Sequence, residues 1–206
     1  MLRKLPSLFA ASSATAAHPG LPDVKPDVAK IFPYVVPSSY LDEPGTPSNS
    51  VIWPLGHGLV VALVFDLGGL VRNVQPEDLV SLGLTTEQAK QRAIENLAQI
   101  AESGVIGQQR FTGPNQKPSV LFGGHWAAAT CILLPGLREM GKKNIGNEPL
   151  CVCIPHRDAL LMFAKGDQAY REAMVKLIKQ NESGARKPLT FEFFELTASG
   201  IKEFKG

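Results

Sequence analysis

The sequence contains few cysteines, and their number and spacing argue against disulfides. Cys131, Cys151 and Cys153 are the three cysteines among 206 residues, so at least one of them cannot pair within the chain. Cys151 and Cys153 lie two residues apart on a segment typical of a strand, a poor geometry for a bond between them. We therefore expect reduced thiols and a cytoplasmic protein.

The features of an export signal are only weakly present at the N-terminus. Arg3 and Lys4 are followed by small and apolar residues and by the small-residue stretch Ala14–Ala16, which together resemble a signal peptide. Pro6 and Ser7 interrupt the apolar middle that such a signal needs. Export through a weak N-terminal signal is therefore the alternative localisation, and the sequence does not say whether the first 20 residues are cleaved.

Neither a long apolar run nor a strong charge imbalance is present. Hydrophobic residues make up 44% of the chain and charged residues 19%, as in a globular protein with a full core. The longest apolar run, residues 58–71, is interrupted by Asp66 and falls short of the roughly 18–20 residues of a membrane helix. The formal net charge is +2, too small to attract a polyanion. We expect neither a membrane nor a nucleic acid as a partner.

The motifs of common nucleophilic and nucleotide-binding enzymes are missing. There is no G-x-S-x-G elbow, and the glycines at 56–58 and 123–124 lack the Lys and Ser/Thr of a phosphate loop. Each of these segments contains or adjoins a histidine, His57 or His125. Glycine-rich backbone can approach a ligand closely, so both histidines are candidate ligand-binding residues. Glycine serving only the turn is the commoner explanation, and we expect no cofactor.

Residues 1–50 are rich in Pro, Ser, Ala and Gly, and we interpret them as an extended, flexible N-terminal arm. Proline removes a backbone donor and biases the residue before it toward extended structure. Within this arm only residues 31–36, "IFPYVV", are expected to be ordered, by docking on the body. The remaining residues, 51–206, are expected to form a single α+β domain.

Apolar runs and helical periodicity alternate along this domain. The segment 85–104 shows the clearest helix, because Thr85 and Gln88 match a capping box and apolar residues recur at helical spacing. The order of elements predicts an α+β fold with a mostly antiparallel sheet and helices packed on one face. The expected strands are 59–66, 118–124, 149–155, 159–164 and 189–196, and the expected helices are 75–83, 85–104, 125–143 and 167–181.

The segment 151–163, "CVCIPHRDALLMF", concentrates polar and apolar residues. Side chains alternate along a strand, so Cys151 and Cys153 share a face, with His156 three residues further on. Thiolates and imidazole bind zinc, but a structural site needs four ligands, and the fourth would have to come from His57, His125 or Cys131. Free cysteine also fills buried strands as a small apolar residue. We favour core packing and predict no metal site.

His156 and Asp158 form the candidate catalytic pair. If the strand continues through them, the two side chains share a face, and the carboxylate could orient the ring for acid–base chemistry. The alternative is a polar hairpin turn in which Asp158 bonds to the backbone. Asp66, at the end of a buried apolar strand, needs a partner. Arg72 across the expected hairpin is one choice, and a site shared with His156 is the other.

Several short motifs resemble the uncharacterised bacterial family typified by YtpQ. They are "ALVFDLGGLVRNVQPEDLVSLGLTTEQAKQRAIENL", "LLPGLREM" and "VCIPHRDALLMF", and the resemblance covers roughly residues 55–196. In that family an Asp ends a strand, a "GLT"-like turn enters a helix carrying an Asn, and a Pro-x-Arg-Asp turn joins two strands. The resemblance supports the fold and makes Asn96 a candidate ligand-binding residue, but it implies no activity. Matched positions are Asp66, Gly83, Leu84, Thr85, Asn96, Pro155, Arg157 and Asp158.

Two functions fit these observations. The first is a non-catalytic module that binds an unknown protein or small-molecule ligand, because the nucleophile, the metal set and the phosphate loop are missing. The second is a hydrolase-like or metal-assisted enzyme in which His156 is the base and Asp158 orients it, with help from His57, His125 or Asp66. We favour the first, so the expectation leans away from an enzyme.

Overall fold

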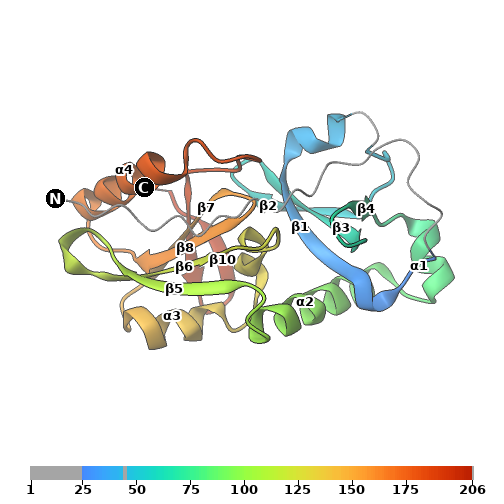
Figure 1. Ribbon diagram of the computed structural model, residues 1–206, viewed down its shortest axis with the longest axis horizontal. Helices are drawn as coiled ribbons and strands as arrows, with labels where there is room; N and C mark the ends of the chain where they lie inside the picture. Colours follow the sequence, from blue (N-terminus) through green and yellow to red (C-terminus); the bar gives the residue numbers. More distant parts are fainter. Residues whose placement is uncertain (1–24, 44–45, 206) are drawn as a thin grey trace. The chain divides into compact units, whose positions relative to one another are not determined.

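A computed structural model describes residues 25–43 and 46–205 (Figure 1). The described residues divide into two compact units, which we call the N-terminal unit (residues 25–103) and the C-terminal unit (residues 104–205). We expected one domain over 51–206. The described residues instead form two cores, and the boundary between them in the sequence lies between Ser103 and Gly104. The part of the predicted arm that precedes residue 25 lies outside the described residues.

The sheet of the N-terminal unit is built around β3 (Leu59–Asp66), which pairs antiparallel with three strands. These are β1 (Ile31–Pro37), β2 (Ile52–Gly56) and β4 (Val71–Asn73). The "LVVALVFD" run is buried at six of its eight positions, as expected of a strand covered on both faces.

Strand β1 corrects the expectation that the chain up to residue 50 is an arm. Residues 31–37 pair in continuous register with β3, from Ile31 opposite Phe65 to Pro37 opposite Leu59. Among the described residues β1 pairs only with β3. A strand paired along one side can accommodate prolines, which explains why the Pro-rich composition did not prevent strand formation.

Two α-helices complete the N-terminal unit, α1 (Pro76–Leu82) and α2 (Thr86–Glu102), with short 3₁₀ turns η1 (Val28–Lys30) and η2 (Ser38–Asp42). The predicted capping box of α2 is confirmed, since Thr85 and Gln88 each accept a backbone N–H from the other. The buried side of α2 packs against the sheet beside Leu63 and Phe65. Its residues there include Ala89 and Ala93.

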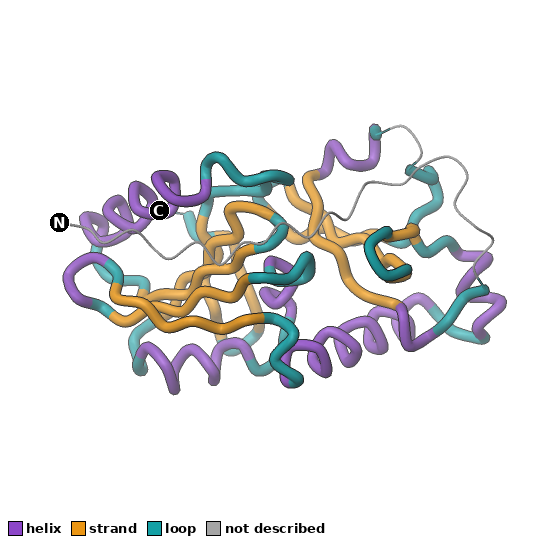
Figure 2. The backbone as a smooth tube through the Cα atoms, viewed as in Figure 1, coloured by secondary structure: helices purple, strands orange, loops and turns teal. Residues whose placement is uncertain are grey.

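The C-terminal unit holds a six-stranded antiparallel sheet in the order β10-β9-β7-β8-β6-β5. Figure 2 draws the strands in orange and the helices in purple. The predicted hairpin is its centre, formed by β7 (Leu150–His156) and β8 (Ala159–Ala164), and every residue of both strands is buried. The other strands are β5 (Gly107–Thr112), β6 (Pro118–Gly123), β9 (Phe193–Thr197) and β10 (Gly200–Glu203).

Helices cover both faces of this sheet, whereas we expected them on one. Helix α4 (Gln168–Glu182) packs on the face that carries Cys151 and Cys153. Helix α3 (Leu137–Ile145) packs on the opposite face, where Gly141 lies against Leu150 and Met162. The predicted helix 125–143 is divided at Pro135 into the 3₁₀ turn η4 (Ala129–Leu133) and α3; another 3₁₀ turn, η3, spans Pro114–Gln116.

The α+β class and the antiparallel pairing are confirmed. Across residues 25–43 and 46–205, no helix is long and apolar enough to cross a membrane.

Candidate functional site

The predicted reversal between two buried strands lies at the end of the β7–β8 hairpin. His156 is the last residue of β7 and pairs with Ala159 of β8, and Arg157 and Asp158 form the turn between them. Asp158 is the one partly exposed residue of the three. The exposed fractions of His156 and Arg157 are 3% and 5%. The cluster is therefore an internal part of the C-terminal unit.

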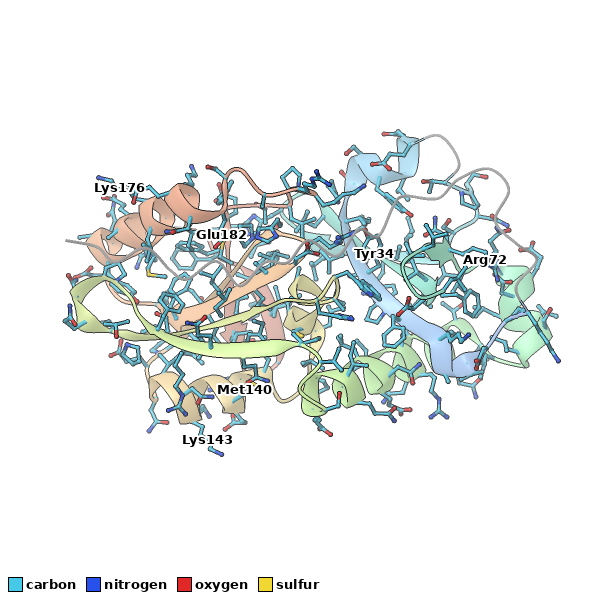
Figure 3. All side chains as sticks on the ribbon, viewed as in Figure 1. Tyr34, Arg72, Met140, Lys143, Lys176 and Glu182 are labelled. Atoms are coloured by element: carbon cyan, nitrogen blue, oxygen red, sulfur yellow. The ribbon has the colours of Figure 1, made fainter. Side chains whose placement is uncertain are left out.

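Both ring nitrogens of His156 take part in hydrogen bonds. Nδ1 accepts the backbone N–H of Asp158 at 3.2 Å, and Nε2 lies 2.9 Å from a carboxylate oxygen of Glu182. A nitrogen that accepts a hydrogen bond carries no proton, so Nε2 carries it and donates to Glu182. Figure 3 shows Glu182 at the C-terminal end of α4. The contact joins the helix to the hairpin.

The Asp158 carboxylate is directed to Arg157 rather than to His156. Arg157 Nε donates to Asp158 Oδ1 at 2.7 Å. The Arg157 backbone is fixed as well, because its N–H donates to the Lys187 carbonyl and its C=O accepts from the Ala129 N–H. Asp158 thus contacts the imidazole through its backbone and does not orient the ring in the way that we expected for an acid–base pair.

Glu182 was missed from the sequence, although a signal for it exists. Along α4, Tyr170, Met174 and Ile178 are spaced by four residues and are all buried. Glu182 continues this row by one more step, and it is buried too. A carboxylate at a buried position needs a hydrogen-bonding partner, and His156 is the partner that it finds.

The three cysteines are free and fully buried. Cys151 and Cys153 belong to the apolar cluster between the sheet and α4, which confirms that their sulfurs fill the core. Burial raises the pKa of Cys131 and of Cys151 to about 12, and it raises the pKa of Cys153 as well. Thiols that stay protonated at neutral pH are poor nucleophiles.

Asp66 and His57 lie at opposite ends of β3. Asp66 accepts the Gly68 N–H through Oδ1 and so caps the turn after the strand. Arg72, one of the two partners considered for it, forms an ion pair with Asp78. His57 lies in the turn before β3 with a positive φ of 49°. Since eight extended residues span about 25 Å, these two residues cannot share one small site.

Asn96 has a structural contact within the N-terminal unit. Its side-chain amide, on α2, donates to the carbonyl oxygens of Val28 and Ile31, both at 2.9 Å. These two bonds fix the segment that leads into β1. The Asn96 amide hydrogens, which we considered for ligand binding, therefore fix the backbone before β1.

His125 and His156 do lie at the same end of the C-terminal sheet. Gly123 of β6 pairs with Ala159 of β8, which pairs with His156 of β7, and His125 follows β6 by two residues. The His125 ring accepts the Ala127 N–H through Nδ1 and packs at 5.4 Å from the Trp126 ring. Its contacts are those of a turn residue.

No group of three or more His, Cys, Asp or Glu side chains placed to hold a metal ion occurs within the described part of the chain. The sequence-derived candidates are consequently distributed over turns and helix contacts.

A groove runs along α4 and has a volume of about 400 Å³. One side is a stripe of α4, and the other is the segment around β9 together with Phe204. Four of its residues are exposed, so the groove is open to solvent along its length. We call it the α4 groove; it is lined by Gln168, Arg171, Glu172, Val175, Lys179, Phe191, Glu192, Phe193 and Phe204.

Cations lie over two of the aromatic rings in the α4 groove. The Arg171 guanidinium is 5.0 Å from the centre of the Phe204 ring, and the Lys179 ammonium is 5.6 Å from the centre of the Phe191 ring. Lys165 approaches Phe204 from outside the groove at 5.1 Å. Such cation–π contacts stabilise exposed sites by about 0.5–1 kcal/mol. They also hold the positive charges above an apolar surface.

Comparisons with protein-family models, curated proteins and solved structures gave no match to this chain.

Proposed function

We propose that the protein is a non-catalytic module that binds a peptide segment of a partner protein along the α4 groove. The observation that carries the proposal is the groove itself: an open channel with an apolar floor and a charged rim. Pockets that bind small molecules enclose most of the ligand surface. An open groove instead suits an extended or helical segment, which buries one side only.

The contacts of His156 support binding rather than acid–base catalysis. One ring nitrogen accepts a backbone N–H and the other faces Glu182. A general base needs a nitrogen within hydrogen-bonding reach of the substrate. The raised thiol pKa of Cys131 and Cys151 likewise disfavours a cysteine nucleophile. We also propose that the chain is related to the bacterial YtpQ-like family.

The proposal can be tested by selecting linear peptides from a random library on the immobilised protein. The selected peptides are then tested against Val175→Trp, which places a ring in the middle of the groove. We expect affinity to fall by at least roughly tenfold, the usual consequence of blocking a central contact. Val80→Trp is the matched control, because Val80 is 81% exposed on α1, in the N-terminal unit.

Selected peptides that bind Val80→Trp like the wild type and lose affinity for Val175→Trp would support the proposal. The proposal would be overturned by a selection that yields no binder, or by binders whose affinity is unchanged by both substitutions. Melting temperatures of both variants report whether the fold is intact.

A further inference from the structure

The α4 groove has an ordered charge pattern. Arg171, Val175 and Lys179 line it at intervals of four residues along one helix. Residues four apart are neighbours on a helix surface. With a rise of 1.5 Å per residue, the two cations are separated by about 12 Å along the helix axis, with the valine midway. The groove thus presents a positive, an apolar and a positive position in sequence.

The two cations are available in different degrees. Lys179 is exposed, and apart from its approach to the Phe191 ring its ammonium has no ion pair within the described residues. Arg171 donates one N–H to the Gly166 carbonyl at 2.9 Å, and a guanidinium has five N–H donors. Both groups can therefore donate hydrogen bonds to a carboxylate of a ligand.

Two carboxylates on the rim lie outside this row. Glu172 follows Arg171 and accepts a hydrogen bond from the Gln168 amide at 2.9 Å. Glu192 lies on the opposite side of the groove and is exposed. The Glu192 carboxylate would repel an anionic ligand in the groove, so removing that charge should strengthen binding rather than weaken it.

The charge of the whole C-terminal unit favours an acidic partner. Residues 104–205 contain fourteen Lys and Arg residues against nine Asp and Glu residues, a formal net charge of +5. Residues 25–103 contain five against nine, a net charge of −4. The near-zero charge of the chain thus conceals a basic unit, whose field would attract an acidic segment.

We infer that the occupant of the α4 groove is an acidic peptide in which two carboxylates flank an apolar side chain. This inference rests on the proposed peptide-binding function. In an extended peptide, side chains two residues apart share a face, and carboxylates four residues apart are separated by about 13 Å. That spacing fits the roughly 12 Å between Arg171 and Lys179, with the apolar side chain over Val175.

The probe is a fluorescein-labelled, acetylated peptide containing Glu-Ala-Leu-Ala-Glu, measured by fluorescence anisotropy on the full chain. Its control replaces both glutamates by glutamine. Exposed ion pairs are each worth a few-fold in affinity, so the glutamate peptide should bind roughly tenfold more tightly at low salt. This advantage should shrink as salt screens the charges.

Lys179→Glu should weaken binding of the glutamate peptide by roughly fivefold or more, through loss of one ion pair and gain of a repulsion. Lys176→Glu is the matched control: it makes the same charge change on the same helix, at an exposed residue that does not line the groove (Figure 3). Glu192→Gln should strengthen binding. In Arg171→Glu/Lys179→Glu, a peptide with lysines in place of both glutamates should bind better than the glutamate peptide.

Equal binding of the glutamate and glutamine peptides, or equal weakening by Lys176→Glu and Lys179→Glu, would overturn the inference. Failure of the inference is distinguishable from failure of the proposed function. If library peptides depend on Val175 but carry no paired acids, peptide binding stands and the acidic pattern is wrong. If no library peptide depends on the groove, the function itself fails.

Discussion

The structural role of the β7–β8 turn is testable through the buried pair of His156 and Glu182. His156→Ala removes the donor to a carboxylate whose side chain is only 6% exposed. Leaving a buried acceptor without its donor costs about 1–3 kcal/mol. The Asp158 N–H also loses its acceptor. Glu182→Ala removes the acceptor of the His156 Nε2 hydrogen bond, which costs about 1–3 kcal/mol.

Urea unfolding of the two single variants and the double variant measures these terms. With an m-value of about 2 kcal/mol per molar for a small unit, His156→Ala should lower the midpoint by roughly 0.5–1.5 M. The double variant removes both hydrogen-bonding partners, so its cost should fall below the sum of the single costs by about 1–3 kcal/mol. An additive cycle, or a cost below about 1 kcal/mol for His156→Ala, would refute the structural role of the pair.

Three further predictions follow from the contacts of single residues. Asn96→Ala should cost about 1–3 kcal/mol and speed amide exchange in β1, with exposed Gln91→Ala as the control; unchanged exchange would contradict this. Gly141→Ala should destabilise the protein by about 1–3 kcal/mol, because an added Cβ would clash with Leu150 Cδ1. Gly184→Ala is the control, since its added Cβ would meet nothing within 4 Å. Equal stabilities of the two variants would count against the prediction. The thiols should resist iodoacetamide at pH 8 until urea unfolds the chain. Because burial raises the pKa of Cys131 and Cys151 from 9.0 to about 12, their contribution to stability is present below about pH 9 and is lost as the pH rises toward 12. Rapid native labelling would contradict the burial.

Long segments with clear periodicity were the most predictable from the sequence. The strand 59–66, the helix after Thr85 and the hairpin around residues 156–158 occur where expected. In each case the local signals agree with one another: a continuous apolar run, a capping box, or a polar turn between two apolar runs. Such agreement lets a local pattern determine an element without knowledge of its neighbours.

The elements that the sequence did not predict depend on pairing with distant segments. β1 contains Pro33 and Pro37, and proline counts against a strand unless the strand pairs along one side, which only the topology reveals. β5, "GQQRFT", is mostly polar because it is the outermost strand of its sheet. A one-sided edge strand leaves little hydrophobic signal in the sequence.

The candidate site could be predicted only in part. The buried thiols follow from their apolar surroundings, but the direction of a polar side chain does not follow from its spacing. Asp66 bonds to its own turn, and Arg72, one of the two partners considered for it, forms an ion pair with Asp78. The α4 groove needs residues from α4, β9 and the segment after β10 to meet, which no short motif encodes.

The most direct test of the binding role is the map of backbone amide shifts caused by a selected peptide, recorded on the full chain by NMR. We predict that the largest changes fall on residues 168–179 of α4, on residues 191–193 and on Phe204. Changes confined to the turn at residues 156–158, with an unperturbed α4, would contradict the assignment of the α4 groove as the binding surface.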